Sequence, residues 1–376
     1  MRIVLFGTYD ERRYPRIAVL REGLTACGLT VQLVNRPLAD STAERIEATY
    51  RPLAAIRWAG RMLAAWCGLL WRSLAIEPPG AVLVGYLGVL DVVLARIRWP
   101  RATIILDHMA PLKAVAEDRG LGRAASAVLS AADRIAESAA DLVLFDTQEN
   151  AQLAAAAATR ACVVPVGAAK DWHAVGEQRS PHAEARSADR PMGVVFFGLF
   201  TPLHGAPIIG EAMRTLALLP IRFTMIGTGQ DRARTEELAG PDVDVTWYDW
   251  IPADRLPQVV ANHDVCLGIF GATPKALRVV PHKVFQGAAA GCAIITLDSP
   301  AQRAVLRHSA IFVPAGDAAA LAGAMKALAA DRALLARYRD AARRAAQAWH
   351  PARTVAPLVR ELENRIRPHV PAPHGG

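Results

Sequence analysis

Short apolar strands alternate with helical stretches along this chain, and a glycine turn follows the first strand. The predicted strand 3–6 runs into Gly7 and Thr8, a helix follows over about 15–27, and the next strand covers 30–34. A strand, a turn and a helix leading to another strand form a βαβ unit with parallel strands. Further strands are predicted at 81–84, 103–106, 142–145 and 162–164. Such strands form a doubly wound sheet, which binds ligands at the carboxyl ends of its strands.

The pattern restarts after a polar stretch. Residues 168–191 are poor in aliphatic side chains, which predicts an interdomain linker. A strand over 193–197 then leads into a loop over 198–205 and a helix over about 206–218. Five more strands are predicted, at 222–226, 243–247, 265–269, 293–297 and 310–313.

We therefore expect an α/β protein with two Rossmann-like doubly wound domains that face each other across a cleft. The first domain is expected at 1–167 and the second at 192–349. Residues 350–376 are predicted to form a helix that crosses back to the first domain, followed by a disordered tail. The length of 376 residues and the hydrophobic share of 52% are enough for two cores.

Composition limits the location and the partners. The five cysteines are scattered without CxxC spacing, which favours reduced thiols in a cytoplasmic protein and gives no metal framework. The N-terminus lacks the pattern of a signal peptide. A net charge of +8 suits a phosphorylated substrate or an anionic membrane. Nucleic acid is not an expected partner, because no motif for it is present.

The stretch 280–300 carries the most functional information. Pro281 sets a turn, His282 and Lys283 begin a helix of small residues, and Gly291 ends it before a buried strand. A helix N-terminus that carries a lysine offers free N–H groups and positive charge in one place, which suits a phosphate. Because it lies late in the second domain, this pattern resembles the donor-site helix of group-1 glycosyltransferases with the GT-B fold.

The resemblance extends to two loops of the second domain. Gly227-Thr228-Gly229 resembles a glycine turn of that family, although a plain tight turn would look the same. The loop 198–205 corresponds to one in which an arginine and a lysine bind the donor diphosphate. In this chain those two places hold Leu199 and His204. His204 and the Thr201 hydroxyl are candidate phosphate ligands, and capping of the next helix is the alternative for His204.

The family's paired glutamates are replaced. Gln286 stands where the family often has a glutamate that bonds the nucleotide ribose, and an amide can both donate and accept there. Arg278 stands in place of the other glutamate and, with Lys275, makes the preceding loop cationic. Lys283, Arg278 and His204 are therefore expected to stabilise the leaving diphosphate.

Other donor-side candidates follow from the same resemblance. The stretch 247–250 corresponds to one that borders the nucleobase, so Trp250 is a candidate for stacking on a base. An aromatic strand end packed in the core is the alternative. Gly7 would allow close approach of the first loop to the donor phosphates, unless it only serves a βα turn.

In the first domain, Asp107 and His108 end a predicted strand. A polar pair at a carboxyl strand end lies where acceptor-side groups are expected. His108 is a candidate contact for the transferred sugar, and Asp107 would orient it or act as a base. A structural cap is the alternative. The loop 117–120 is a weaker candidate for the acceptor side, and a solvated loop is favoured there.

Residues 51–75 form a separate feature. Arg57, Arg61 and Arg72 share a helical face, and three tryptophans accompany them. A basic amphipathic helix with tryptophan suits an anionic membrane surface. A helix packed on the sheet of its domain is the alternative. The predicted location is therefore cytoplasmic, with peripheral attachment to the inner face of the membrane.

The resemblance implies a nucleotide-sugar-dependent glycosyltransferase that retains configuration and needs no metal ion or other cofactor. Its acceptor would be a glycan or a lipid-linked glycan of surface polysaccharide synthesis. Two alternatives stay open, a catalytically silent glycosyltransferase-like subunit and a nucleotide-sugar epimerase of the same fold. Replacement of Lys283 by alanine is expected to abolish nucleotide binding and leave the fold intact, because the lysine is predicted at a helix end outside the core.

Overall fold

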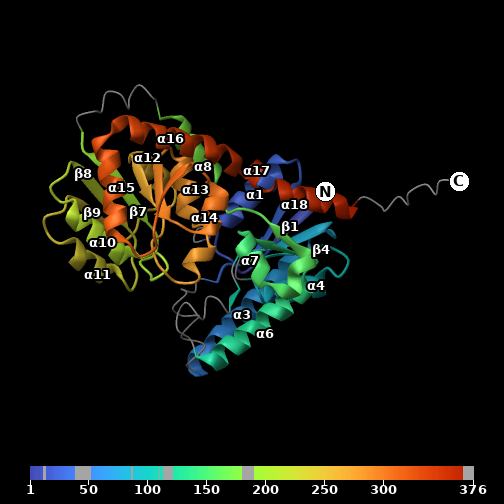
Figure 1. The fold of residues 1–376 in the computed structure, drawn as a ribbon. Coiled ribbons are helices and arrows are strands. Elements are labelled where there is room, and N and C mark those ends of the chain that lie inside the picture. Colours follow the sequence, from blue (N-terminus) through green and yellow to red (C-terminus); the bar gives the residue numbers. More distant parts are fainter. Residues whose placement is uncertain are drawn as a thin grey trace.

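The computed structural model describes residues 1–11, 14–38, 52–85, 88–109, 111–112, 122–179 and 190–366. These residues form two α/β domains, each built on a six-stranded parallel sheet covered by helices (Figure 1). The predicted fold class is confirmed. The loop 117–120 and the end of the tail lie outside the described residues, as do Arg51 and residues 180–189 of the predicted linker.

The N-terminal sheet has the strand order β2-β1-β3-β4-β5-β6. Its strands are β1 (Arg2–Gly7), β2 (Thr30–Asn35), β3 (Ala81–Val84), β4 (Thr103–Asp107), β5 (Leu142–Phe145) and β6 (Ala161–Val163). The helices between them are α1 (Arg16–Ala26), α3 (Pro52–Leu74), α4 (Asp91–Arg98), α6 (Arg123–Ala139), α7 (Gln148–Leu153) and the 3-10 turn η1 (Ala155–Arg160). The central strands are buried on both faces, which explains their continuous apolar runs.

The C-terminal sheet has the order β12-β11-β10-β7-β8-β9. Its strands are β7 (Met192–Phe197), β8 (Ile221–Ile226), β9 (Val245–Tyr248), β10 (Val265–Leu267), β11 (Ala293–Leu297) and β12 (Ala310–Val313). Its helical elements are α10 (Ala206–Thr215), α11 (Arg232–Ala239), α12 (Leu256–Ala261), η2 (Ala276–Arg278), α13 (His282–Ala289), α14 (Pro300–Leu306), α15 (Ala318–Ala330), α16 (Arg332–Ala346) and η3 (Gln347–Trp349).

The first part of the expected linker is a helix of the C-terminal domain. Helix α8 (Lys170–Glu177) packs against α12 and α13, and the Trp172 ring stacks on Phe197 with 5.6 Å between centroids. Trp172 is buried, although its neighbours in sequence are mostly polar. The polar composition of this stretch therefore concealed one buried helix face.

The end of the chain returns to the N-terminal domain. Helices α17 (Pro351–Thr354) and α18 (Ala356–Ile366) lie beside α1 and β6 (Figure 1). Val355, Leu358 and Leu362 are buried in the same cluster as Ile3 and Leu5 of β1. The core of the first domain thus includes side chains from both ends of the sequence.

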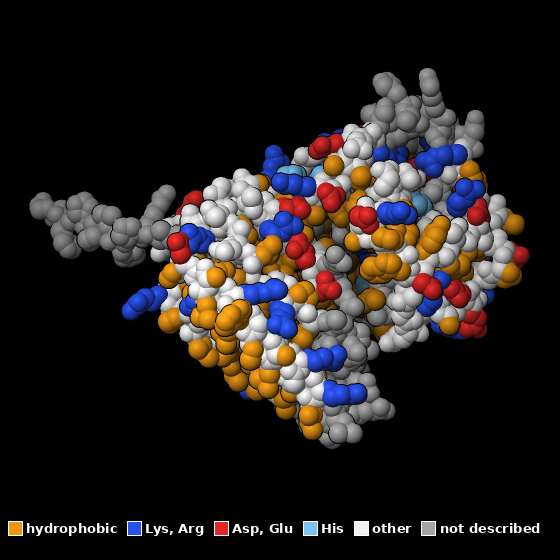
Figure 2. All heavy atoms as spheres, turned by 180° about the vertical axis from the view of Figure 1, so that it is seen from behind, with side chains coloured by type: hydrophobic (Ala, Val, Ile, Leu, Met, Phe, Trp, Pro, Cys, Tyr) orange, Lys and Arg blue, Asp and Glu red, His pale blue; other side chains and the backbone are white. Residues whose placement is uncertain are grey.

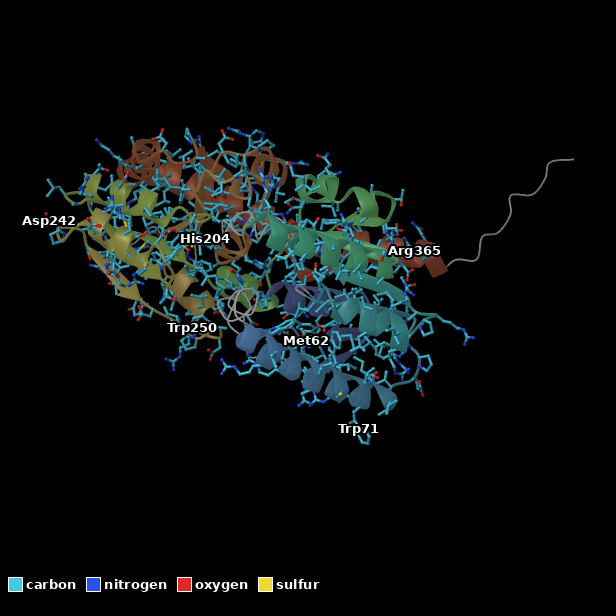
Figure 3. The ribbon with its side chains drawn as sticks, turned by 90° about the horizontal axis from the view of Figure 1, so that it is seen from below. Met62, Trp71, His204, Asp242, Trp250 and Arg365 are labelled. Atoms are coloured by element: carbon cyan, nitrogen blue, oxygen red, sulfur yellow. The ribbon has the colours of Figure 1, made fainter. Side chains whose placement is uncertain are left out.

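Helix α3 packs on the N-terminal domain and also has an exposed face. Leu69 lies in the core, and Trp66 packs against it. Trp71 is 77% exposed and points away from the molecule in Figure 3, whereas Met62 is buried. The two interpretations of this segment, domain helix and surface helix, therefore describe its two faces.

Candidate functional site

The carboxyl ends of the two sheets meet at the start of α13. Thr147, which follows β5, donates its hydroxyl to the Arg278 carbonyl at 2.9 Å and also caps α7. Met109, which follows β4, packs against the apolar cluster that contains Val284 and Phe285 of α13. The predicted catalytic and donor-side segments of the two domains are therefore in direct contact.

Lys283 is buried, with 4% of its surface exposed. Its ammonium nitrogen lies 3.6 Å from the centre of the Phe196 ring and has no hydrogen-bond partner among the described residues. Burial lowers the pKa of Lys283 from 10.5 to about 7. Lys283 lies at the start of α13, as expected, but the expectation that this position is outside the core is wrong, because α13 itself is buried almost throughout.

The loop that carries two predicted donor-binding residues, Thr201 and His204, passes next to this lysine. A Cβ atom on Gly198 would be 3.1 Å from the Lys283 Nζ atom, so the loop after β7 passes directly over the amine. Burial and the Lys283 charge together hold the pKa of His204 well below its usual value, so the imidazole is neutral. Its Nδ1 atom lies 3.2 Å from the Thr201 hydroxyl. Figure 3 shows His204 on the side of the C-terminal domain that faces its partner domain.

The glycines of the turn after β8 allow two loops to touch. A Cβ atom on Gly227 would lie 1.9 Å from the Gly198 carbonyl oxygen, and one on Gly229 would lie 2.3 Å from the Phe200 carbonyl oxygen. Both glycines have φ angles, +128° and +152°, that side chains disfavour. The amide of Phe200 donates to the Thr228 carbonyl at 2.9 Å. The first role of Gly227 and Gly229 is thus to shape the loop that crosses Lys283.

The aromatic stretch after β9 divides into a covered and an open part. The Arg232 guanidinium lies 4.5 Å from the centre of the Trp247 ring, so this face of the ring is occupied. Trp250 is 71% exposed, and its ring is accessible for stacking. Gln286, the candidate for the ribose, is buried on α13.

Asp107 forms an ion pair with Arg16, which was not among the predicted site residues. The Arg16 Nε atom donates to both Asp107 oxygens, at 2.8 and 3.1 Å, and the Nη1 atom donates to the Pro165 carbonyl. Both side chains are buried. Burial raises the pKa of Asp107, and Arg16 opposes this shift. An arginine at the start of α1 carries no local signal for a partner 91 residues away.

Two further carboxylates surround His108. Its Nε2 atom is 3.6 Å from an oxygen of Asp133 and 3.6 Å from an oxygen of Glu137, both on α6. Burial lowers the pKa of His108, and Asp133 opposes this shift. Burial and the nearby Asp133 charge raise the pKa of Glu137 to about 6. His108 was a predicted site residue, whereas Asp133 and Glu137 were not.

Four buried nitrogen atoms of basic side chains on α1, η2 and the start of α13 have no hydrogen-bond partner in the described part of the chain. They are Lys283 Nζ, Arg278 Nε, His282 Nε2 and Arg16 Nη2. Burial and the Arg16 charge lower the pKa of His282 to about 3, which indicates that these two side chains lie near each other across the domain boundary. Buried polar groups in folded proteins are normally paired. These four nitrogens are therefore candidates to bind a ligand with several acceptor atoms.

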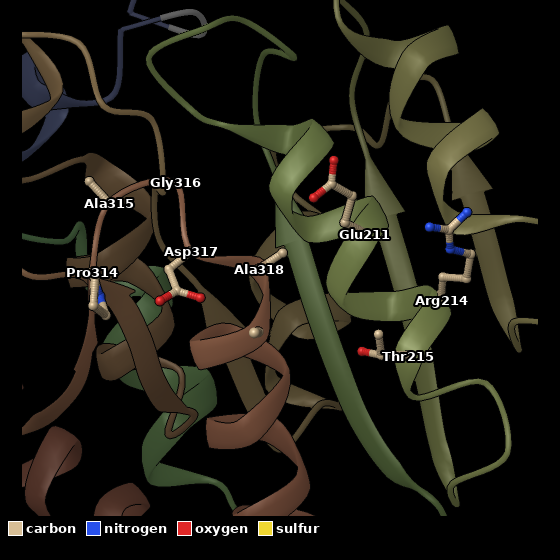
Figure 4. Close-up of a pocket in the computed structure, with 9 residues that line it drawn as sticks. Glu211, Arg214, Thr215, Pro314, Ala315, Gly316, Asp317 and Ala318 are labelled. Atoms are coloured by element: carbon tan, nitrogen blue, oxygen red, sulfur yellow. The ribbon is translucent and has the colours of Figure 1, made fainter.

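A separate hollow lies elsewhere. It has a volume of about 600 Å³ and is lined by the second half of α10 and by the loop after β12 (Figure 4). Glu211 and Arg214 border it, and neither belongs to the predicted site. It is an open surface depression, whereas the unpaired nitrogens are buried. Within the described ranges, no group of three or more His, Cys, Asp or Glu residues is arranged to hold a metal ion.

Among the helices that the structure describes, none combines the length and the apolar character needed to cross a bilayer.

Similar structures define the class of fold. The N-terminal domain of a trehalose-6-phosphate phosphatase from Candida albicans aligns with a TM-score of 0.68 at 12% identity, over 97% of this chain and 96% of that one. Sucrose-phosphate synthase from Thermosynechococcus elongatus aligns with a TM-score of 0.68 at 16% identity, over 97% and 99%. HepE from Anabaena, in complex with UDP-glucose, aligns with a TM-score of 0.66 at 14% identity, over 97% and 99%. The chain therefore has the GT-B fold, as predicted.

The sequence itself places the C-terminal domain in a family. Residues 191–331 match the family model described as "Glycosyl transferases group 1". This region contains the Gly198 loop, the glycine turn and α13, so the predicted resemblance to group-1 glycosyltransferases is confirmed. No curated protein sequence matches the chain. Residues 191–331 are thus a group-1 glycosyl transferase domain within a GT-B fold.

Proposed function

We propose that this protein is a glycosyltransferase that uses a nucleotide sugar, with the diphosphate bound at the start of α13. The observation that carries the proposal is the set of four buried, unpaired nitrogens defined above. The first amides of α13 add further donors, because a helix N-terminus leaves its N–H groups free. A diphosphate offers many acceptor oxygens and a compensating negative charge. The complex of HepE with UDP-glucose supports this ligand class by analogy.

The leaving group is stabilised by cations in a water-poor site. Lys283 and Arg278 supply positive charge where the diphosphate gains negative charge during bond cleavage. His204 is neutral and lies beside Lys283, so it contributes a hydrogen bond rather than a charge. Trp250 offers its exposed ring to the base, and Gln286 is the proposed ribose ligand. We propose no metal ion or other cofactor.

On the acceptor side, His108 is the proposed catalytic residue. Asp133 and Glu137 flank its ring and would stabilise the imidazolium after it accepts a proton. The carboxylate of Asp107 is held by Arg16, so we propose that Asp107 acts by orienting the end of β4 rather than by contact with the acceptor. A glycan or lipid-linked glycan of surface polysaccharide synthesis is the proposed acceptor.

The outer face of the N-terminal domain is the proposed contact with an anionic membrane. On α3, the exposed apolar side chains at positions 56, 63, 71 and 74 recur at spacings of seven, eight and three residues, close to whole helical turns, which keeps them near one face. Exposed apolar residues on α3 and on the neighbouring α4 and α6 are Ile56, Leu63, Trp71, Leu74, Ile97, Val128 and Ile135. Figure 2 shows apolar side chains gathered together with Lys and Arg along the lower edge of this domain. Interfacial helices combine these two features.

The first experiment is a thermal-shift series with UDP, GDP, ADP, dTDP and their sugar conjugates. A ligand that binds the folded state raises the melting temperature, so a response to one base identifies the donor class. Transfer to glycan or lipid-linked acceptors is then measured by product analysis. The absence of any response would contradict the proposal and favour a silent subunit. Conversion of the donor sugar without an acceptor would favour an epimerase.

A further inference from the structure

The loop after β1 is fixed on one side by Asp91. This residue begins α4, and 1% of its surface is exposed. Its Oδ2 atom accepts hydrogen bonds from the Thr8 amide at 2.7 Å and from the Thr8 hydroxyl at 2.8 Å. A Cβ atom on Gly7, whose φ is +142°, would lie 3.0 Å from the same oxygen. The carboxylate therefore sits directly against the backbone of residues 7–9, which we call the β1 loop.

Asn35, the last residue of β2, fixes the other side of the β1 loop. Its Nδ2 atom donates to the carbonyls of Gly7 at 3.1 Å and of Tyr9 at 2.9 Å. The amide of Arg36 also donates to the Gly7 carbonyl, at 3.1 Å. The β1 loop is thus held from both sides by side chains that belong to other elements.

Both of these residues are in turn bonded to α3, Asp91 through its side chain and Asn35 through its backbone carbonyl. The Trp66 Nε1 atom donates to the Asp91 Oδ1 atom at 2.8 Å, and the Arg72 Nη1 atom donates to the Asn35 carbonyl at 2.7 Å. These are contacts of the same helix whose outer face carries the exposed apolar side chains (Figure 3). The chain of hydrogen bonds therefore runs from a surface helix to the carboxyl end of β1 through one residue on each route, the buried Asp91 and the half-buried Asn35.

The route through Asp91 is the stronger one. A carboxylate accepts shorter and stronger hydrogen bonds than a neutral acceptor. Asp91 accepts three hydrogen bonds, two from Thr8 and one from Trp66. We therefore expect the loss of one donor to shift the whole carboxylate. The second route ends in an exposed arginine and is more easily replaced by water.

We propose that Asp91 and Asn35 are positioning residues, through which α3 holds the β1 loop in the geometry that admits substrate. The membrane then acts on the site through these residues, because an anionic bilayer that orders α3 also orders the β1 loop. This inference rests on the proposed function for the identity of the substrate and of the surface. By reciprocity of coupled binding, a substrate that orders the β1 loop strengthens attachment to the bilayer by the same factor.

Hydrogen exchange at the Thr8 amide tests the inference without reference to activity. Single-amide exchange is compared in the wild type, in Trp66→Phe and in the matched control Trp71→Phe. The first change removes the indole N–H that bonds Asp91, and the second alters an exposed ring on the same helix. We expect about tenfold faster exchange at Thr8 in Trp66→Phe, the effect of one hydrogen bond, and none in Trp71→Phe. Asp91→Asn should accelerate exchange at least as much.

The same amide reports on the membrane. Phosphatidylglycerol vesicles should slow Thr8 exchange in the wild type but not in Trp66→Phe, and phosphatidylcholine vesicles should have no effect. Unchanged Thr8 exchange in Trp66→Phe and Asp91→Asn would overturn the positioning role. Vesicle binding without slower exchange, or no vesicle binding at all, would overturn the link to the membrane. The proposed function is tested separately, by the melting temperatures of the thermal-shift series. The absence of any shift with a nucleotide would contradict the proposed function and not the positioning role.

Discussion

Replacement of Lys283 by methionine separates the stability of the fold from nucleotide binding. Methionine keeps the length and the apolar stem of the lysine, and it removes the amine that lies over Phe196 without a partner. Alanine is a poorer choice, because Lys283 is buried and its truncation leaves a cavity that itself destabilises the fold. The methionine variant therefore isolates the effect of the charge.

The effect on stability follows from the pKa. A pKa lowered from 10.5 to about 7 means that the charged amine costs the fold about 5 kcal/mol when it is fully protonated. The unfolded state binds more protons between these two values, so this cost is complete below pH 7 and disappears as the pH rises to about 10.5. We expect Lys283→Met to be more stable than the wild type at pH 6, and the difference to shrink toward pH 10.

The effect on binding has the opposite sign. A charged hydrogen bond to phosphate contributes about 3 kcal/mol, so Lys283→Met should bind the nucleotide diphosphate about 100-fold more weakly at pH 7. Above pH 7 the free amine of the wild type is largely neutral and must take up a proton on binding. The terminal phosphate loses its last proton near pH 6, so its titration does not contribute to the pH dependence of the Kd above pH 7. The wild-type Kd should therefore rise about tenfold for each pH unit above 7.

Isothermal titration calorimetry at pH 8 in buffers of different ionisation enthalpy measures this proton uptake. We expect roughly one proton per nucleotide in the wild type and none in Lys283→Met. Cys266 and His204 are the other titratable groups beside the amine, and neither is charged in this range, because burial raises the pKa of Cys266 and lowers that of His204. Equal nucleotide affinity in the two proteins, or no proton uptake in the wild type, would refute the reasoning.

Three further predictions concern packing, the buried ion pair and the membrane face. Gly227→Ala brings a methyl group to within 1.9 Å of the Gly198 carbonyl oxygen, so chemical denaturation should show a loss of at least about 2 kcal/mol. Gly323→Ala, which meets open space on α15, should change stability by no more than about 1 kcal/mol, and equal effects of the two changes would count against this packing argument. Arg16→Met leaves the Asp107 carboxylate buried without its partner and should cost about 3–5 kcal/mol in the same assay. Adding Asp107→Leu should recover much of this loss, and no recovery would contradict the pairing. Trp71→Ser should weaken sedimentation with phosphatidylglycerol vesicles about tenfold, since it removes one exposed apolar ring; unchanged sedimentation would exclude this face.

The order of strands and helices could be predicted from the sequence because it depends on local patterns. Strands such as Ala81–Val84 and Ala293–Leu297 are short apolar runs, bounded by glycine or polar residues, and both are fully buried. The positions of Gly7, Gly198 and Gly227 at strand ends followed from the same patterns. The predicted start of the donor-site helix also agrees with the structure, since α13 begins at His282.

The contacts that define the site could not be predicted in this way, because they join residues far apart in sequence. Nothing near Arg16 indicates Asp107, and nothing near Trp66 indicates Asp91. The burial of Lys283 was missed for a related reason. Its position in the sequence marks a helix start, but the depth of that helix depends on helices α8 and α16, which pack against α13. The local pattern thus identified Lys283 as a charged group at a helix start, but it did not show that the side chain is buried.

The return of α17 and α18 has a consequence for the order of folding during synthesis. A ribosome that has released the first 167 residues has delivered every strand of the N-terminal sheet, yet Val355, Leu358 and Leu362 are still to be added to its core. The second domain is complete earlier, because the last residue of its core is Trp349, in η3. Domains usually fold in the order in which they emerge. Here the C-terminal domain can close first, and the N-terminal domain becomes complete only when the end of the chain arrives.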